Sequence, residues 1–310
     1  MKGIVSGLVF LLSALLISGY SQTPVSYIRP SLVVPSTVPH VGNHDHLPAI
    51  IDDDLILLPG QIGDVRGYFV LDTGAPSLIV NSRLVAGTGH QINGQSVDGA
   101  QVALREVVVP KVIFRNREHR NVRSLALDLS HLEQYTQKEI LGLLGREWLE
   151  NQPFLFDVSQ RHVLFLDKLA QKTNLAETIT PFKNLEHIPV ITVQVNGAKM
   201  HFGIDSGSAR NLLNKKALSK LPPACTQVVD KIDLQTLSQQ VHRTDIVSVS
   251  GLQLSPHVSP VTADFVVADM SSLHTAEGME LDGLIGLDFL GQYIFSIDYQ
   301  KHKMYWWKLN

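Results

Sequence analysis

The chain has 310 residues, of which 44% are hydrophobic and 18% are charged, and its formal net charge is −3. This length is sufficient for two modest domains with hydrophobic cores, and the composition is that of a globular protein with rather few charges. The negative net charge and the lack of a basic cluster argue against a nucleic-acid partner held through phosphate contacts.

The N-terminal segment has the pattern of an export signal. One lysine precedes the apolar run Ile4–Ile17, and the small residues Gly19 and Ser21 follow it. This order is typical of a secretory signal peptide. We therefore predict a signal peptide over residues 1–21 and a secreted or periplasmic protein with no stable membrane span after signal removal. An uncleaved membrane anchor is the alternative, because the apolar run is near the lower limit for spanning.

Residues 22–48 are proline-rich and have no periodic apolar face, which predicts an extended linker. His40, His44 and His46 have a spacing that could bind a metal, but a linker provides no scaffold to fix the ligands. We therefore expect no metal and no cofactor. Arg29 is the only lysine or arginine in the segment, which favours a tether over a propeptide.

Two similar halves follow, with an N-terminal lobe expected over residues 49–168 and a C-terminal lobe over 188–310. Residues 169–187 are polar without clear alternation and are expected to link the lobes. Most segments favour strands, and Asn196-Gly197 is the strongest hairpin signal. The expected strands are 55–58, 68–71, 107–109, 111–114, 122–129, 154–158, 163–166, 191–195, 199–204 and 304–307, with short helices within 81–85, 146–151 and 209–221.

The two halves repeat one motif at the end of an apolar strand. Asp72-Thr73-Gly74 follows the strand that ends at Leu71, and Asp205-Ser206-Gly207 follows an equivalent strand. The repetition extends further in both halves, which indicates an internal duplication. The matching segments are Asn81 and Asn214, 127–132 and 268–273, Gly142–Gly145 and Gly283–Gly286, 156–157 and 297–298, and 160–162 and 300–302.

The paired motifs, each followed by an apolar-apolar-Gly segment, resemble the pepsin and retropepsin-like aspartic proteases over about residues 50 to 310. The resemblance implies an all-β fold of two homologous β-barrel lobes with a cleft between them and few short helices. The compact lobes suggest a bacterial or similarly small member. A substrate-covering flap is expected between Gly87 and Val109, where the tyrosine common in pepsin-like flaps is absent.

The resemblance makes Asp72 and Asp205 the catalytic pair. Two neighbouring carboxyls that share a proton can activate a water and protonate a substrate carbonyl, as in aspartic-protease dyads. Supporting roles follow for neighbouring residues. Thr73 and Ser206 are expected to tie the loops together through their hydroxyls, Gly74 and Gly207 to allow close backbone approach, and Leu143, Leu144, Gly145, Leu284, Ile285 and Gly286 to pack beneath the loops.

One difference between the halves is Ala75 against Ser208, directly after each motif. A hydroxyl at this position could bind the adjacent carboxylate and stabilise its ionised form. We therefore expect the pair to ionise more readily through Asp205, and Ser208→Ala to move the acid limb of the activity profile to higher pH.

These observations predict an exported aspartic endopeptidase that acts on a peptide or protein substrate. Both loops lie in one chain, so a monomer is favoured. The alternative is a catalytically inert peptide-binding protein of the cell envelope that uses the same fold. The only cysteine, Cys225, cannot form an intramolecular disulfide and is expected to be a structural thiol.

Overall fold

A computed structural model gives the structure of this chain. It describes residues 45–52, 55–86, 89–96, 100–157, 160–166, 176, 178–235, 241–256, 258–270 and 280–308. The expected signal peptide lies outside the described residues, as do His40 and His44.

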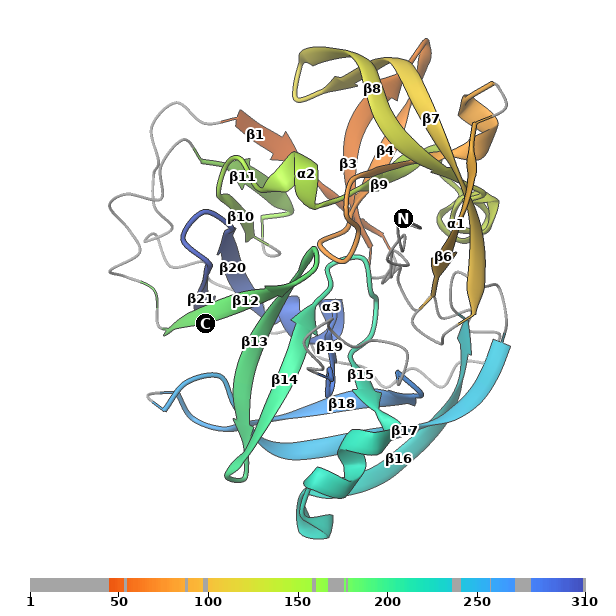
Figure 1. The fold of residues 1–310 in the computed structure, drawn as a ribbon. Coiled ribbons are helices and arrows are strands. Elements are labelled where there is room, and N and C mark those ends of the chain that lie inside the picture. The colour runs from red at the N-terminus through yellow and green to blue at the C-terminus, as the bar shows by residue number, and fades with distance from the viewer. Residues whose placement is uncertain are drawn as a thin grey trace, which may run out of the picture.

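The N-terminal lobe is a closed β-barrel with short helices beside it (Figure 1). Its strands run in the order β2-β3-β4-β9-β5-β8-β7-β6, and β3 also pairs with β7, which closes the barrel. The strands are β2 (Ile50–Asp52), β3 (Leu55–Ile62), β4 (Val65–Leu71), β5 (Leu78–Asn81), β6 (Gln91–Gln95), β7 (Gln101–Phe114), β8 (Arg117–Leu127) and β9 (Ile140–Leu144), and the helices are η1 (Ser82–Leu84), α1 (Ser130–Thr136) and α2 (Arg146–Leu149).

The C-terminal lobe repeats the strand order of this barrel from β3 to β6. Its order is β13-β14-β19-β15-β18-β17-β16, closed by pairing of β13 with β17. In both lobes the strand that precedes the repeated motif pairs in parallel with the strand of the Gly segment. The elements are β13 (Ile188–Val195), β14 (Ala198–Ile204), β15 (Leu212–Asn214), η3 (Lys215–Lys220), η4 (Pro223–Cys225), β16 (Thr226–Gln235), β17 (Val241–Gln253), β18 (Val261–Ala268), β19 (Gly283–Ile285) and α3 (Leu287–Leu290).

A six-stranded sheet joins the two lobes. Its order is β1-β11-β10-β20-β21-β12, so three strands come from each half, and β10 pairs with β20 at the centre. The strands are β1 (Asp45–Pro48), β10 (Phe154–Asp157), β11 (His162–Phe165), β12 (Thr178–Leu185), β20 (Tyr293–Asp298) and β21 (Lys303–Lys308). Phe156 and Phe295 pack edge to face across the central pair with ring centroids 5.4 Å apart, so one apolar core continues through both lobes.

The predicted all-β class with two similar lobes is confirmed by these sheets. The hairpin at Asn196-Gly197 joins β13 to β14, and both residues have positive φ, as a tight two-residue turn requires. The expected hairpin before Asp72 is also present, although its strands extend to Ile62 and from Val65, so the turn is much shorter than expected. Likewise, the separate strands expected on either side of Pro110 form one strand, β7.

Two expected linkers are partly wrong. Residues 178–185 were expected to link the lobes but form β12, which pairs with β21 and β13. Residues 45–48, expected at the end of the proline-rich linker, form β1 and pair with β11. The short helices expected after Asn81 and within 209–221 are 3₁₀ turns, and the second segment also contains β15.

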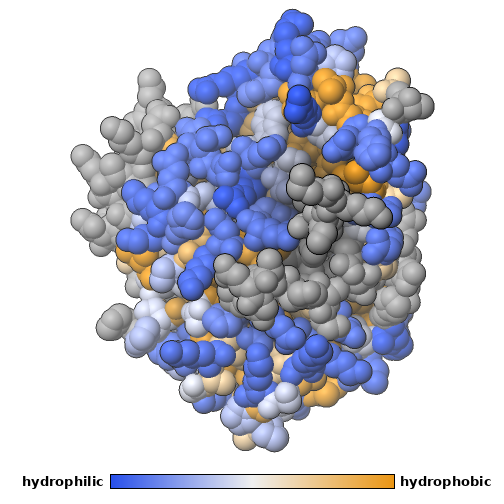
Figure 2. Space-filling model, in the orientation of Figure 1, coloured by the Kyte–Doolittle hydropathy of each residue, from blue (hydrophilic) through white to orange (hydrophobic). Residues whose placement is uncertain are grey.

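The face of the molecule in Figure 2 is largely hydrophilic. Hydrophobic residues gather in one patch over the part of the N-terminal lobe that holds α1 and β6 to β8 (Figures 1 and 2). No helix among the described residues has the length and apolar character needed to span a bilayer.

Candidate active site

Asp72 and Asp205 occupy equivalent positions in the two barrels. Asp72 directly follows β4, and its N–H donates to the Leu144 carbonyl at 3.1 Å; Asp205 directly follows β14, and its N–H donates to the Ile285 carbonyl at 3.0 Å. Both side chains are buried, with 0% and 1% exposure. Each aspartate is therefore fixed by the strand that precedes it and by the neighbouring Gly segment.

The two carboxyl groups are held in the same way. The Gly74 N–H donates to Asp72 Oδ1 at 2.9 Å, and the Gly207 N–H donates to Asp205 Oδ1 at 2.9 Å. The Oδ2 atoms of both are buried and have no hydrogen-bond partner among the described residues. Each carboxyl thus has one anchored oxygen and one oxygen left for a reacting group.

Burial raises the pKa of both carboxyls, because the low-dielectric interior disfavours the charged form. For Asp72 the charge of Asp205 raises the pKa further, while backbone N–H groups of Gly74 and Ala75 oppose the rise. For Asp205 the N–H groups of Gly207 and Ser208 oppose it. The two buried carboxyls therefore titrate as one coupled pair, and burial favours a state in which the pair keeps a proton.

Thr73 and Ser206 tie the two motif loops together by four hydrogen bonds. Each hydroxyl accepts the N–H of the other residue, at 2.9 and 3.1 Å. Thr73 Oγ1 also donates to the Ile204 carbonyl, and Ser206 Oγ donates to the Leu71 carbonyl, both at 2.9 Å. The hydrogen bonds between the two loops that the sequence predicted are present, and they fix the positions of the two aspartates relative to one another.

Gly145 and Gly286 lie directly beneath the motif loops. A Cβ on Gly145 would come within 2.4 Å of the Ser77 carbonyl oxygen, and one on Gly286 within 2.3 Å of the Arg210 carbonyl oxygen. Only glycine permits this contact. The preceding residues Leu143, Leu144, Leu284 and Ile285 are all buried in the cores of the two lobes.

The asparagines nine residues after each aspartate have a matching structural role. Asn81 Nδ2 donates to the Ile140 carbonyl at 3.0 Å, and Asn214 Nδ2 donates to the Leu281 carbonyl at 2.9 Å. Each bond fixes the loop that leads into the Gly segment. These residues therefore support the site from a distance and do not reach the carboxyls.

The expected contact between the Ser208 hydroxyl and the Asp205 carboxylate is wrong. Ser208 Oγ donates to the Arg210 carbonyl at 2.8 Å and so stabilises the loop itself. The serine assists Asp205 through its backbone N–H, and Ala75 makes the same kind of contact to Asp72 in the other lobe. The hydroxyl therefore does not explain a preference for ionisation at Asp205.

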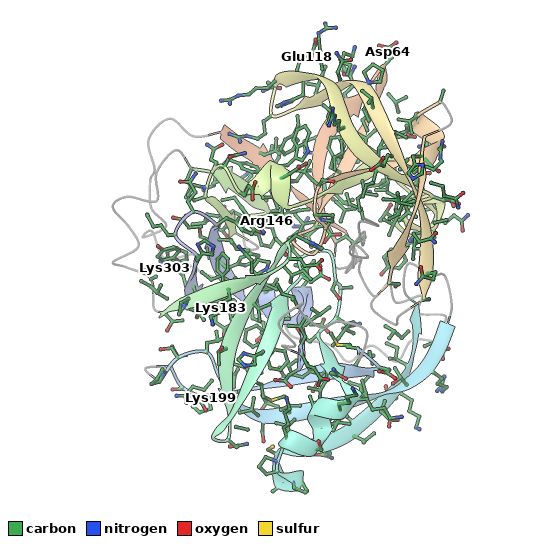
Figure 3. The ribbon with its side chains drawn as sticks, in the orientation of Figure 1. Asp64, Glu118, Arg146, Lys183, Lys199 and Lys303 are labelled. Carbon is green, nitrogen blue, oxygen red and sulfur yellow. The ribbon has the colours of Figure 1, made fainter. Side chains whose placement is uncertain are left out.

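Sequence reasoning missed His187, which lies in the turn between β12 and β13. Its Nε2 atom is 2.7 Å from the carbonyl oxygen of Gly74, and the side chain is buried. Arg146 on α2 donates to the neighbouring Glu186 carbonyl at 2.8 Å, and Figure 3 shows Arg146 between the N-terminal lobe and the green β12–β13 hairpin. No local motif marks His187, because its partner is 113 residues away in the sequence.

Two pockets occupy equivalent places in the lobes, beside the motif loop and the short helix of each. One, of about 570 Å³, is lined by Ser77, Glu147 and residues of β7 and β8. The other, of about 840 Å³, is lined by Arg210, Asp288 and residues of β17 and β18, and also by Ile51 and Phe156 of the other lobe. The hollows on either side of the paired loops are thus related by the internal duplication.

The described residues contain no group of three histidine, cysteine, aspartate or glutamate side chains suited to a metal ion. Cys225 is buried, and its Sγ donates to the Pro222 carbonyl at 3.0 Å. Its environment is that of a packed structural thiol.

Comparison with known proteins gives one family match. Residues 191–289 match a family model described as aspartyl protease. No curated protein matches the sequence. Solved structures that align with the chain include the aspartic proteinase from Irpex lacteus, at 10% identity with a TM-score of 0.47, covering 86% of this chain and 98% of that one. Basic 7S globulin from soybean aligns at 14% identity with a TM-score of 0.45, covering 86% of this chain and 95% of that one.

The matched segment contains Asp205 and most of the C-terminal barrel. The N-terminal barrel repeats the same strand order around Asp72. This chain is thus similar to the aspartyl proteases through residues 191–289.

Proposed function

We propose that this chain is an exported aspartic endopeptidase that hydrolyses peptide bonds with a water activated between Asp72 and Asp205. The main support is the arrangement of the two buried carboxyl groups on matching loops. In each, Oδ1 accepts a backbone N–H and Oδ2 has no hydrogen-bond partner among the described residues. The family match over residues 191–289 supports the same chemistry.

The proposal gives the two carboxyls different roles, with Asp205 ionised and Asp72 protonated at the start. The Asp205 carboxylate takes a proton from the water, whose oxygen bonds to the substrate carbonyl carbon, while Asp72 gives its proton to the carbonyl oxygen. The resulting diol collapses as Asp205 passes its proton to the amide nitrogen and the C–N bond breaks. One diol hydroxyl returns its proton to Asp72, so both carboxyls regain their starting states.

The proposal includes a peptide or protein substrate, a secreted or periplasmic location and a monomeric protein. The location rests on the N-terminal pattern of residues 1–21. The monomer rests on the presence of both motif loops in one chain, tied by the bonds between Thr73 and Ser206.

Cleavage of a diverse peptide library by the purified chain, from acid to neutral pH, tests the proposal. Asp72→Asn and Asp205→Asn are each expected to abolish cleavage. Asp64→Asn is the matched control, because Asp64 is fully exposed at the far end of the N-terminal lobe (Figure 3). Cleavage that survives in either site variant would overturn the mechanism. Peptide binding without cleavage at any pH would instead favour the inert binding protein.

A further inference from the structure

We propose that His187 is a positioning residue for Asp72, acting as a neutral hydrogen-bond donor from the C-terminal lobe to the catalytic loop of the N-terminal lobe. The inference rests on the proposed function only in naming Asp72 as catalytic. The observation that prompts it is the 2.7 Å contact between His187 Nε2 and the Gly74 carbonyl oxygen.

The direction of this hydrogen bond is fixed by its acceptor. A carbonyl oxygen only accepts, so Nε2 must carry the proton. Burial and the nearby Arg146 guanidinium lower the pKa of His187 to about 4, so the ring is neutral at higher pH. The neutral ring then has its single proton on Nε2.

The bond reaches Asp72 through one peptide group. The Gly74 carbonyl and the Ala75 N–H are the two ends of the same amide, and the Ala75 N–H donates to the Asp72 backbone carbonyl at 3.3 Å. The same N–H stabilises the ionised Asp72 carboxyl. A donor on the carbonyl polarises the amide and strengthens the hydrogen bond of its N–H. His187 therefore acts on Asp72 without touching it.

The contact distinguishes the two halves of the site. Gly207 is the counterpart of Gly74, and no described side chain donates to its carbonyl oxygen. The other loop carbonyls are matched, because the N–H groups of Arg146 and Leu287 donate to the Ala75 and Ser208 carbonyls at 2.9 and 2.8 Å. Among the described residues, this side-chain contact is therefore a difference between the two motif loops.

The surroundings of His187 hold its turn in place. Arg146 donates to the Glu186 carbonyl and pairs with Glu150 at 2.9 Å, and its guanidinium lies 5.8 Å from the ring centre of buried Tyr299. The charged or titratable groups near the turn include Arg146 and Glu147 on α2, Glu150 directly after it, Tyr299 after β20, Asp72 on the motif loop and Glu186 beside the histidine. The hairpin and the strands paired with it also carry Lys183 on β12, Lys199 and His201 on β14, and Lys303 on β21.

The test compares His187→Phe, which keeps a ring but has no donor, with His187→Gln, which keeps a donor. His201→Phe is the control, because His201 lies on β14 and contacts Thr192 at 3.1 Å, away from the loops. The carboxyl titration of Asp72 is followed by ¹³C NMR in the full chain, and kcat and KM are measured on a peptide that the wild type cuts.

The Phe variant is expected to raise the apparent pKa of Asp72 by a few tenths of a unit and to lower kcat roughly tenfold with KM within about twofold. The Gln variant is expected to restore most of both. Wild-type values in the Phe variant, or equal losses in both variants, would overturn the proposal, because simple packing would then explain the contact.

A second measurement needs no variant and no cleavage. In the wild type, ¹⁵N NMR of the His187 ring is expected to show the Nε2-protonated tautomer above pH 4. The Nδ1-protonated tautomer would overturn the inference. If the wild type cuts no peptide, the proposed function fails, whereas the tautomer and the Asp72 titration still decide the role of His187.

Discussion

Thr73 and Ser206 bind one another's backbone across the boundary between the lobes. The Ser206 N–H donates to Thr73 Oγ1 at 2.9 Å, and the Thr73 N–H donates to Ser206 Oγ at 3.1 Å. Because each hydroxyl also donates to a carbonyl of the opposite lobe, all the donors are satisfied without water. The distance between the two aspartates is therefore set by side chains adjacent to them.

Thr73→Val is expected to lower the free energy of unfolding by roughly 2 to 4 kcal/mol, because it removes two bonds and leaves the buried Ser206 N–H unpaired. Thr73→Ser keeps the hydroxyl and should cost less than about 1 kcal/mol. Urea unfolding of both variants measures the difference. A loss in Thr73→Val no larger than the loss in Thr73→Ser would contradict the role assigned to the hydroxyl.

Stability should respond to pH through the dyad. Both carboxyls have a folded-state pKa above that of the unfolded chain, so the folded protein keeps protons that the unfolded chain releases. Stability is then full below the unfolded pKa and falls as pH rises toward the folded pKa.

The double variant Asp72→Asn with Asp205→Asn has no carboxyl groups at these positions, so its stability should not fall in this way as the pH rises. It is expected to be more stable than the wild type by on the order of 2 kcal/mol at mildly alkaline pH, with a much smaller difference in acid. Thermal unfolding across pH measures the effect, with Asp64→Asn as the exposed control. A stability difference that does not change with pH would contradict the raised pKa values.

Ser208→Ala is expected to leave the acid limb of the activity profile in place, because the hydroxyl binds the Arg210 carbonyl and not the carboxylate. The lost hydrogen bond should cost about 1 kcal/mol of stability. The pH dependence of kcat/KM is the relevant measurement. A shift of the acid limb to higher pH would place the hydroxyl on Asp205 after all.

Gly145→Ala and Gly286→Ala should each destabilise the protein by roughly 3 kcal/mol and reduce activity, because each added methyl group would meet a backbone carbonyl at 2.4 or 2.3 Å. The two losses should be similar, since the contacts are duplicated. Unfolding by denaturant measures both. A loss in one variant alone would mean that the two lobes do not support their loops equally.

The duplication made much of the fold and the candidate pair predictable from sequence. Each copy of the motif follows an apolar strand, and the Asn196-Gly197 turn fixes the hairpin that presents Asp205. The hydrogen bonds between Thr73 and Ser206 were also expected, because a hydroxyl beside each aspartate can reach the neighbouring loop. These features depend on short sequence patterns that occur in both halves of the chain.

Strand β12 was missed because its polarity is inverted. Its buried face includes Thr178 and Thr180, while Ile179 is 43% exposed. The Trp306 Nε1–H donates to Thr180 Oγ1 at 3.0 Å, which makes a buried threonine acceptable there. Buried and exposed residues therefore alternate along β12, but polar residues occupy some of the buried positions and Ile179 an exposed one, so the hydropathy pattern does not show the alternation. His187 was missed for a related reason, because its only signal is a distant partner.

The central ladder of the shared sheet pairs a strand with its own duplicate. Leu155 lies opposite Ser296, Phe154 opposite Ile297 and Phe156 opposite Phe295. Each residue of β10 has its sequence counterpart 141 positions later, so Leu155 faces its own counterpart, and the two flanking pairs exchange under a half-turn. This is the register of an isologous contact between identical subunits. Each lobe thus presents an edge strand whose pairing residues complement those of its counterpart in the other lobe.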